Sequence, residues 1–345
     1  MKTFNLCLLG FGNVNRTLIE LLRLKGGGLL DRYGISWRIT GIASRRLGWL
    51  ANAGGFQTSE LCGADTPVRE KLAGAQNLGG IQSWLQRAQA DVLFEATSLN
   101  VETGQPAIDH IRAALEFGAH AITANKGPIV HAYRELRDLA ALKGKKFLFE
   151  STVMDGVPIF SMFRDSLPAI EVKGFRGILN STTNVILTGM EQGLSFDEAL
   201  RKAQALGIAE TDASYDIDGW DAAVKVCALV NVVMDVAMRP KEVEREGIRS
   251  LTGQQVRAAR RDGTPYKLVC RACRDGSARE GSAVRASVRP EQVPLDDPFA
   301  LVSGTSSIIR FETDIFPGLT ITETDPGLYA TAYGMLANFI RVASS

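Results

Sequence analysis

The chain has 345 residues, of which 45% are hydrophobic and 22% charged, and its formal net charge is +1. This length is sufficient for two domains that each bury a core. The near-neutral charge lacks the strong basic field typical of proteins that bind nucleic acid. No apolar run reaches the roughly 18 residues of a membrane span. We therefore expect neither nucleic acid nor a membrane as a partner.

The N-terminus and the cysteines favour a cytoplasmic protein. Residues 1–10 are short and apolar and run directly into a glycine turn, which is typical of a first strand and not of a signal peptide. The 5 scattered cysteines favour reduced thiols. Cys270 and Cys273 form one CxxC, but in an extended strand residues three apart point to opposite faces. This disfavours the alternative of a zinc or redox pair.

Strand and helix patterns alternate along the first part of the chain. The predicted strands are Phe4–Leu9, Trp37–Ala43, Asp91–Ala96, Ala119–Thr123 and Lys146–Glu150. The predicted helices follow Gly12 and span Pro106–Phe117 and Tyr133–Leu142. Such alternation predicts an α/β fold with a Rossmann-type, doubly wound parallel sheet over residues 1–150.

The pattern changes after residue 150. Strands are predicted at Glu171–Leu179 and Tyr266–Ala272, and helices at Phe196–Leu206 and Trp220–Met234. This mixture predicts a second, α+β domain over residues 151–309. The C-terminal segment, about 310–345, contains an amphipathic helix that we expect to pack back on the first domain.

The first strand ends in a glycine-rich turn, Gly10-Phe11-Gly12-Asn13-Val14-Asn15. The first glycine permits a tight turn, and the second allows the backbone to approach a pyrophosphate at the amino end of a helix. The alternative is a plain strand–helix turn, but this motif lies between a strand and a helix, as dinucleotide binding requires. Asn15 replaces the third glycine, so a slightly looser contact between helix and strand is expected.

The end of the second strand indicates which dinucleotide is bound. An NAD site usually carries an acidic residue there for the ribose 2′-hydroxyl, whereas this chain has Ser44-Arg45-Arg46. Ser44 can hydrogen-bond a 2′-phosphate and an arginine can neutralise it. NADP(H) is therefore predicted over NAD(H). The alternative is a solvated arginine pair.

Carboxylates gather around one lysine in the second domain. Asp221 and Lys225 are four residues apart on a predicted helix, so they share a face. Glu210, Asp212, Asp216 and Asp218 precede that helix. This combination suits a substrate with an α-ammonium group and a hydroxyl. The alternative is an ordinary surface ion pair, although the flanking residues are apolar and indicate burial.

Three segments in this order resemble homoserine dehydrogenase: Ala124-Asn125-Lys126-Gly127-Pro128, RGILNSTTN over 176–184, and AQALGIAE over 203–210 continuing to DIDGWDAAVK over 216–225. The resemblance runs from the first strand to about Ser303, and more weakly beyond it. It implies NAD(P)-dependent interconversion of L-homoserine and L-aspartate 4-semialdehyde by a homodimer.

The resemblance also implies roles for individual residues. Lys225 corresponds to the proton-transfer lysine, and Lys126 to a catalytic lysine near the nicotinamide. Homoserine would be bound by Glu210, Asp216 and Asp221. The positions expected to contact the cofactor are Gly10, Phe11, Gly12, Asn13, Val14, Ser44, Arg45, Thr97, Lys126 and Gly327.

Residues 150–158 resemble the monovalent-cation loop of the family. Glu150, Val153, Asp155 and Val157 would supply oxygen ligands, mostly backbone carbonyls, which suit sodium or potassium. The alternative is a strand followed by a Gly-Pro turn. The family normally has small residues at the positions of Met154 and Asp155.

Other positions depart from the family pattern. Ser181 stands where a glycine is usual, and Asp325-Pro326-Gly327 replaces a Gly-Ala-Gly run near the cofactor. No appended regulatory domain is expected, because the chain ends soon after the last helix.

Two alternatives stay open: a catalytically idle NADP-binding sensor, and a related NADP-dependent dehydrogenase such as aspartate-semialdehyde dehydrogenase. The latter needs a cysteine nucleophile beside a histidine, and none of the cysteines has that context.

Overall fold

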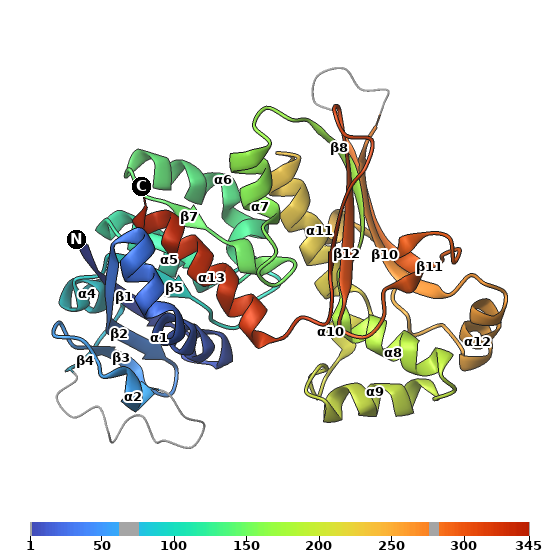
Figure 1. The fold of residues 1–345 in the computed structure, drawn as a ribbon, viewed down its shortest axis with the longest axis horizontal. Helices are drawn as coiled ribbons and strands as arrows, with labels where there is room; N and C mark the ends of the chain where they lie inside the picture. Colours follow the sequence, from blue (N-terminus) through green and yellow to red (C-terminus); the bar gives the residue numbers. More distant parts are fainter. Residues whose placement is uncertain (1, 62–75, 276–282, 345) are drawn as a thin grey trace. The chain divides into compact units, whose positions relative to one another are not determined.

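A computed structural model of the chain describes residues 2–61, 76–275 and 283–344 (Figure 1). The chain divides into two compact units, residues 1–161 together with 327–345, and residues 162–326. The sequence analysis placed this division at residue 150 and assigned residues 310–345 to the first domain. The structure differs because two strands within 307–323 complete the sheet of the second unit.

The first unit is built on a seven-stranded sheet in the order β4-β3-β2-β1-β5-β6-β7. The strands β2, β1, β5, β6 and β7 run parallel, whereas β3 and β4 add an antiparallel edge. The strand bounds are β1 Lys2–Leu9, β2 Ile35–Ser44, β3 Gly48–Ala51, β4 Gln76–Leu78, β5 Val92–Glu95, β6 His120–Thr123 and β7 Phe147–Leu148. The predicted α/β doubly wound fold is confirmed, with a seventh strand shorter than expected.

Helices cover both faces of this sheet. On one face Leu6 and Leu8 of β1 join a core with α1 (Asn13–Tyr33) and α13 (Leu328–Ala343). On the other face Cys7 and Leu9 pack with α4 (Ile81–Ala88) and α5 (Ala107–Phe117). Both faces of β1 are apolar, as expected for a strand buried between two layers of helices. The remaining elements are α2 (Thr58–Leu61), α6 (Gly127–Leu142), η1 (Glu150–Thr152) and α7 (Ile159–Ser161).

The C-terminal helix α13 belongs to this first unit, beside α1 (Figure 1). The Phe339 ring packs edge-on against Phe4, with 5.6 Å between centroids. Gly156 lies so close to α13 that an added Cβ would stand 2.3 Å from the Ala330 carbonyl oxygen. Only a glycine permits this approach without displacing the helix.

Asn15 strengthens the junction between β1 and α1, contrary to the loosening that the sequence analysis expected. Its side chain is fully buried. The amide Nδ2 donates to the carbonyls of Leu9 (3.1 Å) and Gly10 (3.0 Å), where the strand ends. The asparagine therefore replaces close backbone contact with two hydrogen bonds.

The second unit has a six-stranded sheet in the order β13-β12-β8-β10-β11-β9. Neighbouring strands are antiparallel except for β9 and β11. The bounds are β8 Val172–Ile178, β9 Glu244–Arg245, β10 Tyr266–Arg274, β11 Val284–Gln292, β12 Ser307–Thr313 and β13 Leu319–Glu323. On β10 the two cysteines of the CxxC lie on opposite faces, with Cys270 buried and Cys273 exposed.

The helices of the second unit are α8 (Ser181–Glu191), α9 (Phe196–Ala205), α10 (Ser214–Ile217), α11 (Trp220–Val233) and α12 (Gly253–Arg261), with the short turns η2 (Met162–Ser166), η3 (Pro240–Glu242) and η4 (Pro298–Leu301). Side chains begin several of them: Asn180 caps α8, and Ser195 forms a capping box with Glu198 on α9. Within the described residues, no helix has the length and hydropathy of a membrane-spanning segment.

Candidate active site

A hollow of about 590 Å³ opens at the carboxyl edge of the first sheet. Its walls come from the ends of β1, β2 and β5 and from the beginning of α5. The lining residues are Leu9, Gly10, Phe11, Gly12, Ala43, Ser44, Arg45, Arg46, Trp49, Ala96, Thr97, Ser98, Pro106 and His110. This is the edge at which open α/β sheets bind their ligands.

The glycine turn shapes this hollow for an anionic group. Gly10 has φ +82°, and an added Cβ would stand 2.3 Å from the Ala96 carbonyl oxygen, so the tight turn requires glycine. Gly12 precedes α1 without a side-chain cap, and nothing lies within 4 Å of the place where its Cβ would be. The amino end of α1 therefore has room and N–H donors for a phosphate. The residues present fit a dinucleotide.

A basic and aromatic rim completes the hollow beside β2. Arg45 and Arg46 are exposed, and the Ser44 hydroxyl accepts the N–H of Leu47 at 3.1 Å. The Trp49 and His110 rings meet edge to face at 5.8 Å between centroids. Burial lowers the pKa of His110, so its ring stays neutral near pH 7.

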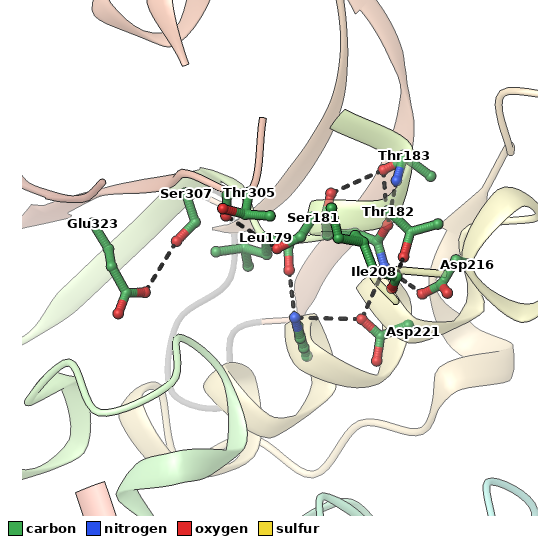
Figure 2. Close-up of polar contacts among 12 residues, drawn as sticks. Leu179, Ser181, Thr182, Thr183, Ile208, Asp216, Asp221, Thr305, Ser307 and Glu323 are labelled. Carbon is green, nitrogen blue, oxygen red and sulfur yellow. Dashed lines mark hydrogen bonds and ion pairs between the residues drawn. The ribbon is translucent and has the colours of Figure 1, made fainter. Parts of the chain in front are cut away.

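In the second unit, Asn180 joins two carboxylates from different helices. It is 4% exposed, and its Oδ1 accepts the N–H of Thr183 at 2.9 Å as the cap of α8. Its Nδ2 donates to Asp216 of α10 (2.6 Å) and to Asp221 of α11 (3.0 Å). Figure 2 shows Asp216 and Asp221 converging below the first turn of α8. One capping side chain thus positions both acids.

Lys225 adds a cation to this cluster. Its Nζ lies 3.4 Å from Asp221 Oδ2, one helical turn away, and donates to the Leu179 carbonyl. The side chains of Asp221 and Lys225 are each 15% exposed, and the surrounding positions of α11 are buried. The pair is therefore mostly desolvated, unlike the surface ion pair that was the alternative interpretation.

The two carboxylates of the cluster repel each other, which favours the binding of another cation. Burial raises the pKa of Asp216, and the neighbouring Asp221 raises it further, while Asn180 and Lys225 act in the opposite direction. Burial and the same two carboxylates raise the pKa of Tyr215 on α10. Two close carboxylates in a poorly solvated site favour a positively charged ligand group.

Comparisons with family models cover both the glycine turn of the first unit and the Asn180 cluster of the second. The family model described as homoserine dehydrogenase, NAD binding domain, matches residues 10–150, and the model described as homoserine dehydrogenase matches residues 158–340. The chain belongs to the homoserine dehydrogenase family. This match decides against the aspartate-semialdehyde dehydrogenase alternative.

Individual homoserine dehydrogenases align along the whole chain. The NAD(+)-dependent homoserine dehydrogenase of Pseudomonas canavaninivorans is 35% identical over 100% of this chain and 97% of its own. The structure of a homoserine dehydrogenase from Thiobacillus denitrificans has a TM-score of 0.82 and 28% identity, covering 100% of this chain and 74% of that one. A hyperthermophilic archaeal homoserine dehydrogenase mutant in complex with NADPH has a TM-score of 0.80 and 27% identity, covering 99% and 98%.

The structure gathers only part of the predicted homoserine dehydrogenase site. Asn13 and Val14 begin α1 outside the lining of the hollow, and Gly327 is an exposed cap of α13. Lys126 is half-buried immediately before α6. Glu210 is exposed, and the recorded hydrogen bond at this residue comes from Gln204 Nε2 to its backbone carbonyl. In the part of the chain that the structure describes, no hydrogen bond or ion pair joins its carboxylate to Asn180, Asp216 or Asp221.

The predicted cation loop has competing uses for its oxygens. The buried Glu150 carboxylate accepts the N–H groups of Phe160 (2.7 Å) and Ser161 (3.0 Å). The Val157 carbonyl accepts the N–H of Ile159 at 2.8 Å, and Asp155, at φ +41°, contacts the Thr331 hydroxyl. The candidate ligand atoms are all oxygens, which fits a hard cation. The burial of the Glu150 carboxylate, however, is already explained by the two N–H groups that donate to it.

Sequence reasoning missed several site residues. Asn180 was noticed only as part of a motif, because its contacts bring together residues 36 and 41 positions away. Trp49 and His110 reach the hollow only through folding of the sheet edge. Ser181 fits without glycine, since it lies inside α8 and its hydroxyl donates to the Thr305 carbonyl at 3.1 Å.

The Asn180 cluster predicts a pH-dependent cost for Asn180→Asp. The change would place a third carboxyl against Asp216 and Asp221, and burial would raise its pKa as it raises that of Asp216. A raised folded-state pKa gives stability below the unfolded pKa that is lost as pH rises through the folded value. The loss in the free energy of unfolding should therefore be small near pH 4 and grow toward pH 7, to about 3 kcal/mol, and Tm should fall accordingly.

Asn231→Asp is the matched control, because Asn231 is also buried and its side-chain oxygen accepts the N–H of Met238. Thermal unfolding across this pH range measures both variants. A deficit of Asn180→Asp that is equal at both ends of the range, or no larger than that of the control, would contradict the electrostatic account.

Proposed function

We propose that the protein catalyses the NAD(P)-dependent interconversion of L-homoserine and L-aspartate 4-semialdehyde. The observation that carries this proposal is the desolvated Asp221–Lys225 pair joined to Asp216 through Asn180, inside the segment that the homoserine dehydrogenase model matches. A catalytically idle sensor would have no reason to keep this costly arrangement.

The carboxylates supply the recognition of the substrate. In this proposal Asp216 and Asp221 bind the α-ammonium group of homoserine, and its charge relieves their mutual repulsion. Glu210, exposed on the preceding loop, contributes from the rim of the site.

Lys225 moves the proton of the reaction. Held by Asp221 and the Leu179 carbonyl, its neutral amine accepts the hydroxyl proton, directly or through water, as the alcohol is oxidised. In the reverse direction its ammonium group stabilises and protonates the developing alkoxide. Bound NAD(P) supplies the acceptor for the hydride. Lys126, at the amino end of α6 in the first unit, assists on the nicotinamide side. The Gly10–Gly12 turn and the amino end of α1 hold the pyrophosphate.

Lys225→Ala should lower kcat by about 100-fold or more, because general acid–base groups act mainly in the transition state. Asp221→Ala should chiefly raise the KM for homoserine, since its partner is charged in ground and transition states alike. Steady-state kinetics measure both effects. The dissociation constant for the cofactor should be unchanged in both variants.

Lys202→Ala, at an exposed lysine of α9 in the same unit, is the control and should keep normal kinetics. Each variant must retain its thermal transition, because breaking a buried pair can cost several kcal/mol. A folded Lys225→Ala with near-normal kcat would disprove the proton-transfer role and make Lys126 the leading candidate.

The proposal includes a preference for NADP(H), supported by Arg45 and Arg46 on the rim of the hollow. The relatives differ in this respect, since one is named NAD(+)-dependent and another was solved with NADPH. Arg45→Ala should weaken NADP binding by about 10-fold and NAD binding little, because only NADP carries the 2′-phosphate.

Calorimetry with both dinucleotides checks this, with Arg87→Ala on α4 as the control for loss of an exposed arginine. Equal affinity of the unchanged protein for NADP and NAD would end the NADP assignment. Binding is the appropriate readout here, because tight binding and fast turnover need not go together.

A monovalent cation at residues 150–157 is the third part of the proposal. Oxygens of Glu150, Val153, Asp155 and Val157, mostly backbone carbonyls, would hold it, and Asp155 would add its carboxylate. Replacing sodium and potassium by a bulky organic cation at fixed ionic strength should lower Tm or activity, because a bound ion stabilises by mass action. Asp155→Asn should weaken that response. If neither quantity changes in the unaltered protein, the loop binds no such cation.

We also propose, from the family resemblance, that the protein is a cytoplasmic homodimer whose second unit carries the dimerisation surface. Light scattering of the purified protein measures the oligomeric state directly.

A further inference from the structure

A closed ring of hydrogen bonds lies behind the cofactor hollow and begins at Glu95, the last residue of β5. The Glu95 side chain is fully buried. Its Oε1 accepts the backbone N–H of Thr97 at 2.9 Å and also the Thr97 hydroxyl. Its Oε2 accepts the hydroxyl of Thr123, the last residue of β6, at 2.7 Å. One carboxyl thus joins the ends of two neighbouring strands.

Asn125 closes the ring from the other side. The Thr123 hydroxyl oxygen accepts the N–H of Asn125 at 2.9 Å. The Asn125 side chain then donates from Nδ2 to the Thr97 carbonyl at 3.1 Å and accepts the N–H of Gly127 at Oδ1, at 2.9 Å. The ring therefore fixes two loops, 96–98, which lines the hollow, and 124–127, which carries Lys126.

Burial of Glu95 has a cost that ordinary packing does not explain. Burial raises its pKa, and the hydrogen bonds from Thr97 and Thr123 only partly compensate. Among the described residues Glu95 takes part in no ion pair. An apolar residue would fill a buried strand end at lower cost. What the carboxyl provides is a pair of acceptors that reach both loops at once.

We propose that Glu95 is a positioning residue which, through Thr123 and Asn125, holds the loops of Thr97 and Lys126 in the geometry that the reaction needs. This rests on the proposed function, because it assigns Lys126 to the nicotinamide side. Glu95 touches neither substrate nor cofactor, and acts through the backbone of residues 97, 125 and 127. A small displacement of these loops would misplace Lys126 and lower the rate.

The first test is a set of kinetic variants. Thr123→Val removes the hydroxyl between Glu95 and Asn125 at nearly constant volume, and Glu95→Gln replaces one of the two acceptors by a donor. Each should lower kcat by about 10-fold and change the KM for homoserine by less than about 3-fold. Thr123→Ser, which restores the hydroxyl, should recover most of kcat. Thr40→Val is the matched control, since Thr40 is fully buried in β2 of the same sheet, and it should leave kcat unchanged.

The second test is amide hydrogen exchange, which does not depend on turnover. Thr123→Val should speed amide exchange in residues 124–127 by about 10-fold, because the N–H of Asn125 loses its acceptor. Thr40→Val should not have this effect. Normal kcat in folded Thr123→Val and Glu95→Gln, or an equal loss in Thr40→Val, would overturn the positioning role. If the unaltered protein failed to oxidise homoserine, the proposed function would be overturned instead. Hydrogen exchange alone would then decide whether the ring fixes the loop 124–127.

Discussion

The amide of Asn180 holds two half-buried carboxylates together, and the site proposed for the substrate depends on that interaction. Asp216 and Asp221 come from separate helices and would repel each other in a site with little water. Asn180 reaches both from the cap of α8, and Lys225 balances one of them from the next turn of α11. In the proposed function, a cationic substrate group offsets this repulsion. The geometry therefore favours an amino acid substrate over a neutral alcohol.

The first unit contains the NAD binding domain of the family. Its ligand carries a doubly charged pyrophosphate, although the protein itself is almost neutral. The groups proposed to bind it belong to the backbone: the Gly10–Gly12 turn and the uncapped amino end of α1. Asn15 secures that helix to β1, and the Glu95 ring secures the two neighbouring strand-end loops. Buried side chains thus fix the position of backbone groups and of Thr97 and Lys126, which are the groups proposed to face the cofactor.

Much of this could be predicted from sequence because the signals are local. The period of apolar residues predicted the five parallel strands and the helices α1, α5 and α6 of the first unit, but not β3, β4 or α4. The i,i+4 spacing placed Asp221 and Lys225 on one face. Strands β11, β12 and β13 were missed, although burial alternates along β11 and along the second half of β12, where Arg289 and Arg310 occupy exposed positions. Asn180 and Glu95 act across long sequence separations, so no spacing rule reveals their partners. A carboxylate inside the apolar run 91–96 was nevertheless a signal, since buried strands rarely carry an unpaired charge.

The most direct test of the central claim is a stoichiometric assay of the purified, unaltered protein with L-homoserine and NADP, in which the aldehyde product is trapped as a hydrazone. The account predicts that reduced cofactor and trapped L-aspartate 4-semialdehyde form in equal amounts, and only when homoserine is present. Protein that binds NADP normally but forms neither product with homoserine would contradict it.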